Sequence, residues 1–351
     1  MNKIQEALTH GLQKRLYTAA VARVIYDERA VFETAIGLLD PKKERSEAKQ
    51  DSIFDLASLT KIFVATAFMR MVELGRIGLD DPILKIVPEF KGGEREKATF
   101  RHLLTHSSGL PASFNLYEKQ DWNKGREVVM KKLFATPLIY SPGSMVVYSC
   151  LGFMLLGYVM EEITGNRLDK VLEEVLFRPL KWHDVLFRPS VEYEGRIAVT
   201  TYTRPNRGVL TPGTVHDGNA IALHNGIAGN AGLFGTVEGV SLLGEMFLNQ
   251  TFLSQQIIKQ MTSLQAKFNS ERRGLGWKLH SKNSDCPGNP LSDSSYGHTG
   301  FTGTSLWVDP EKRLVMTLLT NSVHYYDNNY GPKEFNVFRR QFHQYALDSL
   351  S

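Results

Sequence analysis

Cysteine is scarce in this chain, which contains only Cys150 and Cys286 among its 351 residues. Two thiols form one disulfide at most, so the sequence excludes a small fold held together by a disulfide framework. Net charge is small too, at +4, from 41 basic and 37 acidic residues. The basic residues are scattered and are not interleaved with aromatic side chains, which argues against nucleic acid as a partner.

Long hydrophobic runs are missing as well. The most apolar segment, 145–160, is shorter than the roughly 18 apolar residues in a row that a membrane-spanning helix needs, and Glu161 and Glu162 follow it directly. We therefore expect a buried core helix there and no membrane span. Residues 1–24 contain no uninterrupted apolar stretch and no cleavage-site pattern, so we expect no signal peptide and a cytoplasmic protein. The pattern of residues indicates no particular oligomeric state.

What the chain has is an ordinary globular composition, with 42% hydrophobic and 22% charged residues, and enough length to bury a large core. Strand patterns occur near both ends, and helical patterns occur at the termini and through the middle. We expect strands at 19–27, 30–39, 274–281, 296–310 and 313–323. We expect helices at 3–16, from 58 onward, and at 152–165, 167–177 and 333–350.

This order of elements predicts an α+β fold with one antiparallel sheet built from both ends of the chain. Helices from the two termini would flank the sheet, and a mainly helical region would be inserted between its two halves. We expect a single catalytic unit over 1–351, with an α/β part at about 1–80 and 266–351 and a helical part at about 81–265. A catalytic site is expected between the two parts.

One lysine, Lys61, interrupts the apolar run that follows Ser58. If a helix begins at Ser58, the two side chains lie one turn apart on one face, and the helix N-terminus favours negative charge on the serine oxygen. Burial lowers the pKa of a lysine, so we expect Lys61 to be neutral enough to take the proton of Ser58. Ser46 and Lys49 have the same spacing, but they lie in a charged loop where a lysine stays hydrated and protonated.

Two further stretches carry candidate residues. Tyr148 follows a Pro-Gly turn at the start of an expected helix, where a phenol near a lysine can share the role of general base. The alternative is a core tyrosine that is tied by its hydroxyl group. Three glycines within 297–303 indicate close approach of a ligand or of another backbone, lined by His298 and Thr299. The alternative there is an irregular edge strand.

The segments SLTK at 58–61, YSC at 148–150 and HTG at 298–300 occur in the order of three motifs that share one chemistry. In this respect the chain resembles the serine β-lactamase and penicillin-binding-protein superfamily. It looks most similar to class C β-lactamases, DD-peptidases and related esterases. The resemblance runs from about Val21 to Asn321. It implies a β-lactamase/transpeptidase-like fold and an acyl-enzyme mechanism that needs no cofactor and no metal.

Carried over residue by residue, the resemblance implies that Ser58 is the acylated nucleophile. Lys61 and Tyr148 would activate it and carry protons to the leaving group. The backbone N–H groups of Ser58 and Phe301 would form the oxyanion hole. The expected substrate-binding residues are Cys150, His298, Thr299, Gly300 and Phe301.

Residues 215–236 and 298–329 resemble a narrower branch, found beside bacterial N-acetylglucosaminidases of cell-wall recycling. Some of its members are described as muropeptide amidases. This resemblance implies either that His216, Asp217 and Asn219 contribute to substrate binding or that they brace a loop.

The chain departs from the superfamily at two positions. Cys150 stands where amide-recognising members carry Asn, and a thiol offers only weak hydrogen bonds. His298 stands where many members carry Lys, and histidine has an ordinary pKa of about 6.5. We therefore expect efficient turnover of activated esters, weak hydrolysis of β-lactams, and binding of anionic substrates that improves from about pH 8 to 6.

The sequence thus predicts a serine hydrolase that acts on an ester or amide, such as a peptidoglycan-derived peptide or a β-lactam-like compound. One alternative is a small-ester carboxylesterase. Another is a sensor that is acylated by penicillins or peptidoglycan fragments and does not turn over. A metal site is not expected: His102 and His106 have a zinc-like spacing, but Leu103 stands where a metalloprotease needs Glu.

Overall fold

The structure is a computed structural model, and it describes residues 2–43, 46–113, 116, 125–204, 208–209, 211–281, 291–325 and 332–350. Its α-helices are α1 (Asn2–Gln13), α2 (Thr60–Glu73), α3 (Phe100–Leu104), α4 (Arg126–Ala135), α5 (Cys150–Thr164), α6 (Leu168–Leu172), α7 (Gly218–His224), α8 (Val237–Asn249), α9 (Gln255–Thr262) and α10 (Pro332–Asp348). Among the described residues, no helix is long and apolar enough to cross a membrane.

The strands are β1 (Ala19–Tyr26), β2 (Arg29–Gly37), β3 (Phe54–Asp55), β4 (Val185–Phe187), β5 (Thr203–Arg204), β6 (Gly208–Val209), β7 (Leu233–Gly235), β8 (Ala266–Phe268), β9 (Glu271–Arg273), β10 (Lys278–Leu279), β11 (Tyr296–Thr299), β12 (Ser305–Asp309) and β13 (Leu314–Thr320). The main sheet has the order β2-β1-β13-β12-β11-β10-β9-β8, and every neighbouring pair is antiparallel. Its centre pairs β1 with β13, so the prediction of one antiparallel sheet built from both ends of the chain is confirmed.

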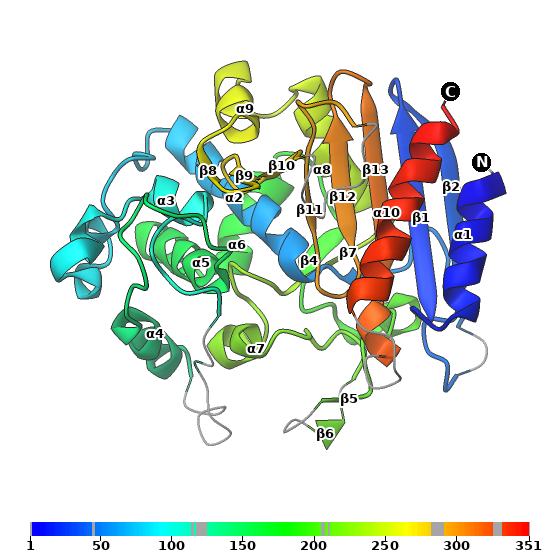
Figure 1. Cartoon of the computed structure of the whole chain (residues 1–351). Coiled ribbons are helices and arrows are strands. Elements are labelled where there is room, and N and C mark those ends of the chain that lie inside the picture. The colour runs from blue at the N-terminus through cyan, green and yellow to red at the C-terminus, as the bar shows by residue number, and fades with distance from the viewer. Residues whose placement is uncertain are drawn as a thin grey trace.

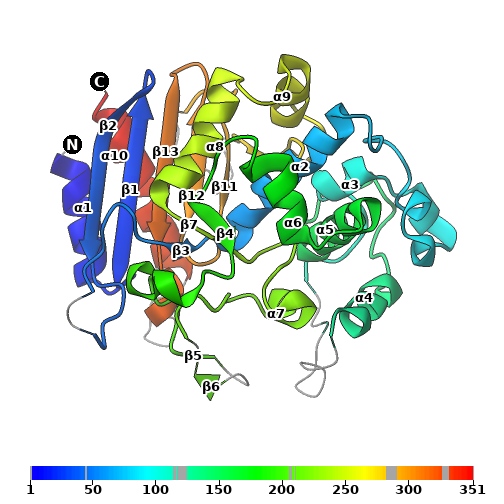
Figure 2. The ribbon, with the colours of Figure 1, turned by 180° about the vertical axis from the view of Figure 1, so that it is seen from behind.

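The two faces of the sheet belong to different cores because side chains alternate along a strand. In β1, Ala20, Ala22 and Val24 pack beneath the terminal helices α1 and α10. Val21 and Ile25 face the other way, into the large core that continues into the helical region. Figure 1 shows α1 and α10 side by side over one face, and Figure 2 shows α8 over the opposite face. The expected flanking by terminal helices is thus confirmed, and α8, from within 81–265, also packs on the sheet.

The strand pattern near the C-terminal end differs from the expectation in three ways. Segment 296–310 forms two strands, β11 and β12, with a turn between them, because Gly300 N–H bonds the carbonyl of Thr304 and closes the chain back on itself. Only Lys278–Leu279 of segment 274–281 is a strand. The β8–β9 hairpin that completes the sheet was not expected, because its residues are polar and carry no alternating pattern.

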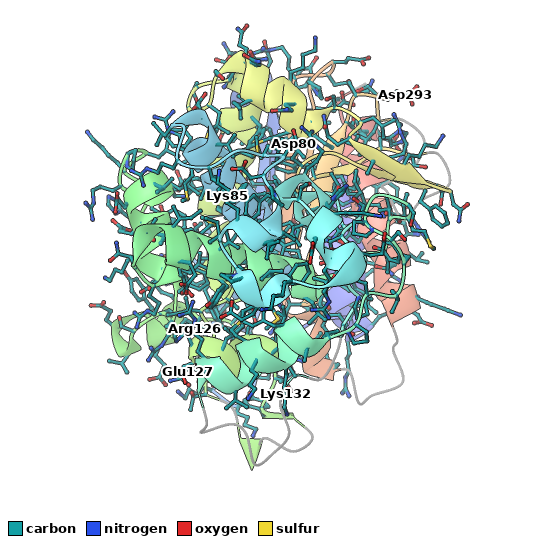
Figure 3. All side chains as sticks on the ribbon, turned by 90° about the vertical axis from the view of Figure 1, so that its left-hand side faces the viewer. Asp80, Lys85, Arg126, Glu127, Lys132 and Asp293 are labelled. Carbon is teal, nitrogen blue, oxygen red and sulfur yellow. The ribbon has the colours of Figure 1, made fainter. Side chains whose placement is uncertain are left out.

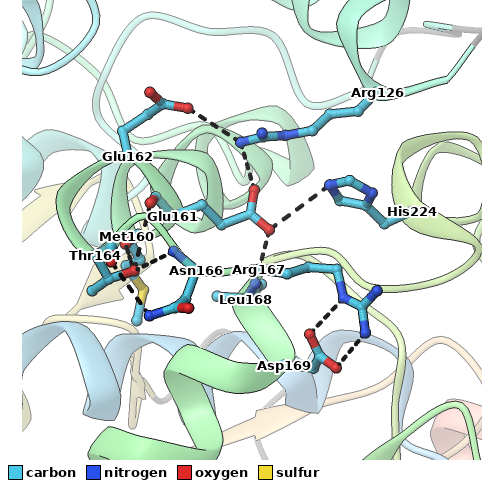
Figure 4. A network of polar contacts seen from close by, with 10 residues as sticks. All are labelled: Arg126, Met160, Glu161, Glu162, Thr164, Asn166, Arg167, Leu168, Asp169 and His224. Carbon is cyan, nitrogen blue, oxygen red and sulfur yellow. Dashed lines mark hydrogen bonds and ion pairs between the residues drawn. The ribbon is translucent and has the colours of Figure 1, made fainter.

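The helical region is held by a buried ion-pair network around Glu161, which Figure 4 shows in close view. Its carboxylate accepts a hydrogen bond of 2.8 Å from Leu168 N–H at the start of α6 and lies 2.6 Å from Arg126 Nη2 on α4. His224 of α7 approaches to 3.9 Å. One carboxylate therefore joins α4, α5, α6 and α7. The outer side of this region carries solvated charges such as Lys85 and Lys132 (Figure 3).

Candidate active site

The Ser58 turn is a strained connection between β3 and α2. Ala57 has a φ of +47°, in the left-handed region that non-glycine residues rarely adopt. Asp55 holds this turn, because its carboxylate accepts a hydrogen bond of 2.9 Å from Ala57 N–H. Ser58 then lies in a single 3₁₀ turn, Ala57–Leu59, that runs directly into α2. The expected helix start is therefore confirmed, with a tighter first turn than a plain α-helix.

Lys61 is fully buried and reaches back to the serine. Its Nζ donates hydrogen bonds to Ser58 Oγ at 3.0 Å and to the carbonyl oxygen of Asn230 at 2.8 Å. Cys150 Sγ lies 3.6 Å from the same nitrogen. The Ser46/Lys49 pair does not repeat this geometry, because Ser46 Oγ bonds the carbonyl of Lys43. The structure thus brings Lys61 onto Ser58, in the interior of the protein.

The charge state of Lys61 is a correction to the sequence prediction. Burial lowers the pKa of Lys61, but its electrostatic interactions with the Cys150 and Tyr148 side chains outweigh burial and place that pKa above its ordinary value. Burial raises the pKa of Tyr148, against the opposing effect of the Lys61 cation. At neutral pH the pair is therefore an ammonium group beside a neutral phenol. A neutral lysine base was expected because the sequence shows burial but not the polar groups that surround Lys61 Nζ in the fold.

Tyr148 is positioned by the start of α5. Ser149 caps this helix, because its Oγ accepts from Gly152 N–H at 3.2 Å, and Ser149 N–H donates to His106 Nδ1 at 3.0 Å. The His106 ring lies against the Tyr148 ring with centroids 4.6 Å apart. The phenol hydroxyl contacts both Ser58 and Lys61, and Lys61 Nζ lies 5.0 Å from the ring centroid. The structure therefore brings the three expected catalytic residues together.

The third motif lies at the end of β11 and in the turn to β12. Gly300 packs so close to the Ser58 turn that a Cβ atom there would lie 2.6 Å from the carbonyl oxygen of Leu56. Thr302 Oγ1 donates to the carbonyl of Asp55 at 2.7 Å, and Thr304 Oγ1 donates to the carbonyl of Leu56 at 3.1 Å. The close approach that the glycines indicated is thus an approach of backbone to backbone. It fixes the turn that carries Phe301 against the segment that carries Ser58.

The charge of His298 is the second correction. Its ring is 3% exposed, and Nδ1 lies 2.9 Å from the carbonyl of Thr299, which makes Nδ1 the protonated nitrogen of a neutral imidazole. Burial, together with the positive charges of Arg273 and Lys61, holds the pKa of His298 well below its usual range. The expectation that His298 gains charge between pH 8 and 6 is therefore wrong. The sequence pattern could not reveal the two cations beside it.

Cys150 is the first residue of α5, half-buried, and its thiol is free. Cys286 lies outside the described residues. The two histidines with zinc-like spacing are used elsewhere: His102 Nδ1 accepts from Thr99 N–H, and His106 Nδ1 accepts from Ser149 N–H. Both side chains therefore hold the backbone at helix ends.

The segment 216–219 lies beside the third motif. His216 N–H donates to Asp55 at 2.7 Å, and its ring stacks on Phe301 with centroids 5.5 Å apart. Asp217 caps α7 by accepting from Ala220 N–H, and Asn219 accepts from Leu116 N–H. These contacts favour the bracing alternative for Asp217 and Asn219, and they link His216 to the mouth of the site.

The Ser58 turn, Tyr148 and the third motif line one cleft of about 330 Å³. Its walls include the expected residues Ser58, Tyr148, His298, Thr299, Gly300 and Phe301. Lys61 and Cys150 lie behind that wall. The cleft is also lined by four cations that sequence reasoning missed, namely Arg273, Lys278, Arg339 and Arg15. The pair Arg272 and Arg273 before the segment GLGW is visible in the sequence. Only the β8–β9 hairpin, however, brings Arg273 to the site.

An antiparallel sheet beside a helical region, with a serine bonded to a buried lysine and a tyrosine in the cleft between, is the architecture of an active-site serine hydrolase. The β-lactamase family model matches residues 4–333. The chain is 31% identical over 344 residues to an N-acetylmuramyl-L-alanine amidase of Bacillus subtilis (strain 168), covering 88% of this chain and 78% of that protein.

It is 30% identical over 348 residues to a putative D-alanyl-D-alanine carboxypeptidase of Escherichia coli (strain K12), covering 88% of this chain and 79% of that one. A class C β-lactamase has the same fold, with a TM-score of 0.79 at 19% identity, covering 100% of this chain and 96% of that one. This chain belongs to the β-lactamase family, and it is a serine hydrolase of that family. The resemblance inferred from the three motifs is confirmed.

Proposed function

We propose that the protein hydrolyses an amide bond of a peptidoglycan-derived peptide through an acyl-enzyme on Ser58. The observation that carries this proposal is the 3.0 Å hydrogen bond from Lys61 Nζ to Ser58 Oγ, with the Tyr148 hydroxyl in contact with both. Nucleophile, proton carrier and positive charge thus meet at one point of one cleft.

Acylation follows from this geometry as a proton relay. Ser58 Oγ bonds to the carbonyl carbon of the substrate, and its proton moves to the Tyr148 oxygen. Tyr148 gives its own proton to the leaving nitrogen as the C–N bond breaks. The Lys61 cation stabilises the negative charge that develops on these oxygens, so it need not lose its own proton. Water then attacks the ester on Ser58, and the same relay returns the proton to Oγ.

The oxyanion of the tetrahedral intermediate would be bound by the N–H groups of Ser58 and Phe301. The hydrogen bonds from Thr302 and Thr304 to the carbonyls of Asp55 and Leu56 support this role, because they hold the two donor segments at a fixed separation. Donors that need no reorganisation during the reaction are the ones that stabilise a transition state most.

The substrate class draws on the relatives. One is named as an amidase of N-acetylmuramyl-L-alanine, and another as a putative D-alanyl-D-alanine carboxypeptidase. The first name describes hydrolysis of the amide between an N-acetylmuramyl group and L-alanine, and the second describes hydrolysis of the peptide bond between two D-alanine residues. The same acyl-enzyme chemistry serves either bond, and we extend it to this chain. The cytoplasmic location stays a prediction of the sequence.

A specific observation also favours ester hydrolysis as a second candidate function. Cys150 stands beside Lys61, where amide-recognising relatives carry Asn, and its thiol gives the scissile amide only a weak hydrogen-bond partner. An activated ester depends less on such orientation, because its leaving group departs without full protonation.

A turnover screen decides between these functions. Purified protein is incubated with muramyl peptides, D-alanyl-D-alanine peptides, p-nitrophenyl esters and penicillin, and the products are quantified per mole of protein. The proposal predicts many turnovers on at least one peptide amide, lost in Ser58→Ala. Turnover of esters alone supports the carboxylesterase. One equivalent of bound penicillin or peptide without further hydrolysis identifies the non-turnover sensor and contradicts the proposal.

A further inference from the structure

A second hollow lies outside the catalytic cleft, at the place where α4 begins and α7 ends. It has a volume of about 540 Å³, and its described lining residues include Arg126, Arg167, Arg188 and His224. These four side chains come from four separate segments of the chain, and we call this site the arginine hollow. Among the described residues, no Asp or Glu lines it, and none of its lining residues lines the cleft at Ser58. The charged groups of its walls are therefore all basic.

Arg188 is the arginine of this hollow that the protein itself does not use. It follows β4, its side chain is exposed, and it has no hydrogen bond or ion pair within the described part of the chain. Its φ is +49°, in the left-handed region that non-glycine residues rarely adopt. All five N–H donors of its guanidinium group are therefore available to a ligand.

The other two arginines are oriented by carboxylates and keep further donors. Asp169 accepts from Nε and Nη2 of Arg167 at 2.7 Å each. Because both bonds use one side of the planar guanidinium group, Nη1 points away from Asp169, as Figure 4 shows. Arg126 reaches Glu161 and Glu162 through Nη2 alone, and its Nε is buried without a partner among the described residues. Burying a donor without a partner is costly, so these nitrogens indicate a site for an acceptor.

His224 indicates the sign of the electrostatic potential in the arginine hollow. Burial lowers its pKa, and the positive charges of Arg126 and Arg167 lower that pKa further, against the opposing charge of Asp169. The dipole of α4 has its positive end at the hollow and that of α7 its negative end, so the two largely offset each other. The guanidinium groups therefore set the potential, which favours an anion.

A wider hollow of about 730 Å³ adjoins the first, because Arg167 and Arg188 line both. Among its described lining residues, Asp169 is the one carboxylate, and it is bound to Arg167. The walls combine apolar and hydroxyl side chains, among them Phe187, Val191, Ser190 and Thr211. Such walls suit an organic group that has both apolar faces and hydroxyl groups.

We propose that these joined hollows form a binding site for a small phosphate monoester, such as a sugar phosphate. The phosphate group would lie among Arg126, Arg167 and Arg188, and the organic part would lie in the wider hollow. A phosphate fits better than a carboxylate, because its dianion offers three terminal oxygens that guanidinium groups from three segments can share. The site is separate from the catalytic cleft, so this inference goes beyond the proposed hydrolase function and does not rest on it.

Isothermal titration calorimetry with glucose 6-phosphate, inorganic phosphate and glucose tests this site. We expect glucose 6-phosphate to bind most tightly, inorganic phosphate to bind more weakly, and glucose not to bind. Arg188→Met should weaken the binding of glucose 6-phosphate by about tenfold or more, as expected for the loss of charge-assisted hydrogen bonds. Because Arg188 has no partner in the described part of the chain, the variant should keep its fold and its activity toward esters.

Arg178→Met is the matched control. Arg178 is also exposed, and its substitution removes the same charge, but it lines neither hollow and lies 3.8 Å from Glu173. We expect this variant to bind glucose 6-phosphate as wild-type protein does. His224 gives a second readout, in which NMR follows the pKa of its ring and His224→Gln identifies the signal. That pKa should rise when the phosphate binds, because a nearby dianion favours the protonated ring.

Four results would overturn the inference. Binding that survives in Arg188→Met and disappears in Lys278→Met places the phosphate in the catalytic cleft. A pKa of His224 that glucose 6-phosphate leaves unchanged places it away from the arginine hollow. Inorganic phosphate that binds as tightly as glucose 6-phosphate removes the role of the wider hollow. Binding to phosphatidylcholine vesicles that contain phosphatidic acid, without binding of glucose 6-phosphate, assigns the arginines to a lipid surface. None of these results bears on hydrolysis at Ser58, which is measured separately.

Discussion

Glu161 and Lys61 are both buried charged residues, but their surroundings pair the two charges differently. Glu161 is compensated: Arg126 lies 2.6 Å away, and Leu168 N–H donates to the same carboxylate (Figure 4). Lys61 has no carboxylate within ion-pair distance in the described part of the chain. Its Nζ is bonded to the hydroxyl of Ser58 and to the carbonyl of Asn230, which are neutral.

Unpaired buried nitrogens are more numerous around Lys61 than around Glu161, where Arg126 Nε also lacks a partner. Near Lys61, His106 Nε2, His298 Nε2, Arg273 Nε and the side-chain amide of Asn230 are buried without hydrogen-bond partners among the described residues. Three of these residues surround Tyr148: the rings of His106 and His298 and the guanidinium of Arg273 all lie within 6.0 Å of its ring centroid.

This difference in pairing indicates the role of each cluster. A charge that is paired and hydrogen-bonded joins helices at a modest net cost. A buried positive charge that has no carboxylate within ion-pair distance is costly, and this cost is offset when negative charge develops nearby. In the Lys61 cluster that charge would develop on Ser58, on Tyr148 and on the substrate.

Removing the charge of Lys61 should have the largest effect. Lys61→Met keeps the apolar stem and deletes the ammonium group, so the proton relay loses its electrostatic support. We expect kcat/KM for an activated ester to fall by about 10³-fold or more. Steady-state kinetics measure this, with thermal unfolding to show that the variant is folded. A loss of less than tenfold would mean that the unpaired charge plays no part in catalysis.

Tyr148→Phe should have the next largest effect. The phenyl ring keeps its packing on His106 and beneath Arg273, but the hydroxyl that relays the proton is gone. We expect the acylation rate to fall by about 10²- to 10³-fold. Rapid-mixing measurements of acyl-enzyme formation give this rate directly. Acylation at the wild-type rate would remove Tyr148 from the relay.

Glu161→Gln should change stability and leave catalysis alone. Glutamine can still accept from Leu168 N–H, but it loses the charge that pairs with Arg126. Because burial raises the pKa of Glu161, folding disfavours its ionised form, so we expect the free energy of unfolding at pH 7 to rise by about 1 kcal/mol. Denaturant unfolding measures this change, and kcat/KM should stay within about twofold of wild type. A tenfold loss of kcat/KM at unchanged stability would show that the two clusters do not differ as described.

The same variant tests a pH dependence. Burial raises the pKa of Glu161 above its ordinary value, although Leu168 N–H and Arg126 oppose this. Between the ordinary and the raised pKa, the folded protein binds more protons at this site than the unfolded chain. The contribution of Glu161 to stability therefore falls as pH rises through that interval. We expect this slope in wild-type protein to be reduced in Glu161→Gln, in denaturant unfolding at a series of pH values. Equal slopes of stability against pH in the two proteins would contradict the assignment of this pH dependence to Glu161.

His298 gives the smallest predicted effect. Because its pKa is held well below the usual range, the His298 ring stays neutral as pH falls from 8 to 6. Two aryl esters with the same acyl group, one with a meta-carboxylate and one with a meta-carboxamide on the phenol leaving group, test this. The ratio of their kcat/KM values, which measures the preference for the anionic ester, should change less than about twofold across that range. A preference that grows more than fivefold toward pH 6, and loses its pH dependence in His298→Gln, would show that this ring is protonated.

The fold was largely predictable from the sequence, because its strongest signals are local. The alternation along 19–27 and 313–323 gave the two central strands, and Gly165 gave the end of α5, where it takes a φ of +67°. The β8–β9 hairpin was not predictable, since its short strands are stabilised by pairing at the edge of a sheet and not by their own pattern.

The site was predictable where its chemistry lies within a few residues. Ser58 and Lys61 are one helical turn apart, and the apolar run that follows Ser58 distinguished this pair from Ser46 and Lys49. Charge states were not predictable, because they depend on contacts across the fold: Tyr148 and Cys150 raise the pKa of Lys61, and Arg273 depresses that of His298. Asn230 was missed for a similar reason, since it acts through a backbone carbonyl that no motif identifies.

The most direct test of the Lys61 cluster as the catalytic centre is intact-mass measurement after treatment with a fluorophosphonate. The account predicts one adduct per chain in wild-type protein, located on Ser58 by peptide mapping. It predicts no adduct in Ser58→Ala and full labelling in Ser46→Ala, whose serine has the same spacing to a lysine but bonds the carbonyl of Lys43. An adduct that persists in Ser58→Ala would contradict the account.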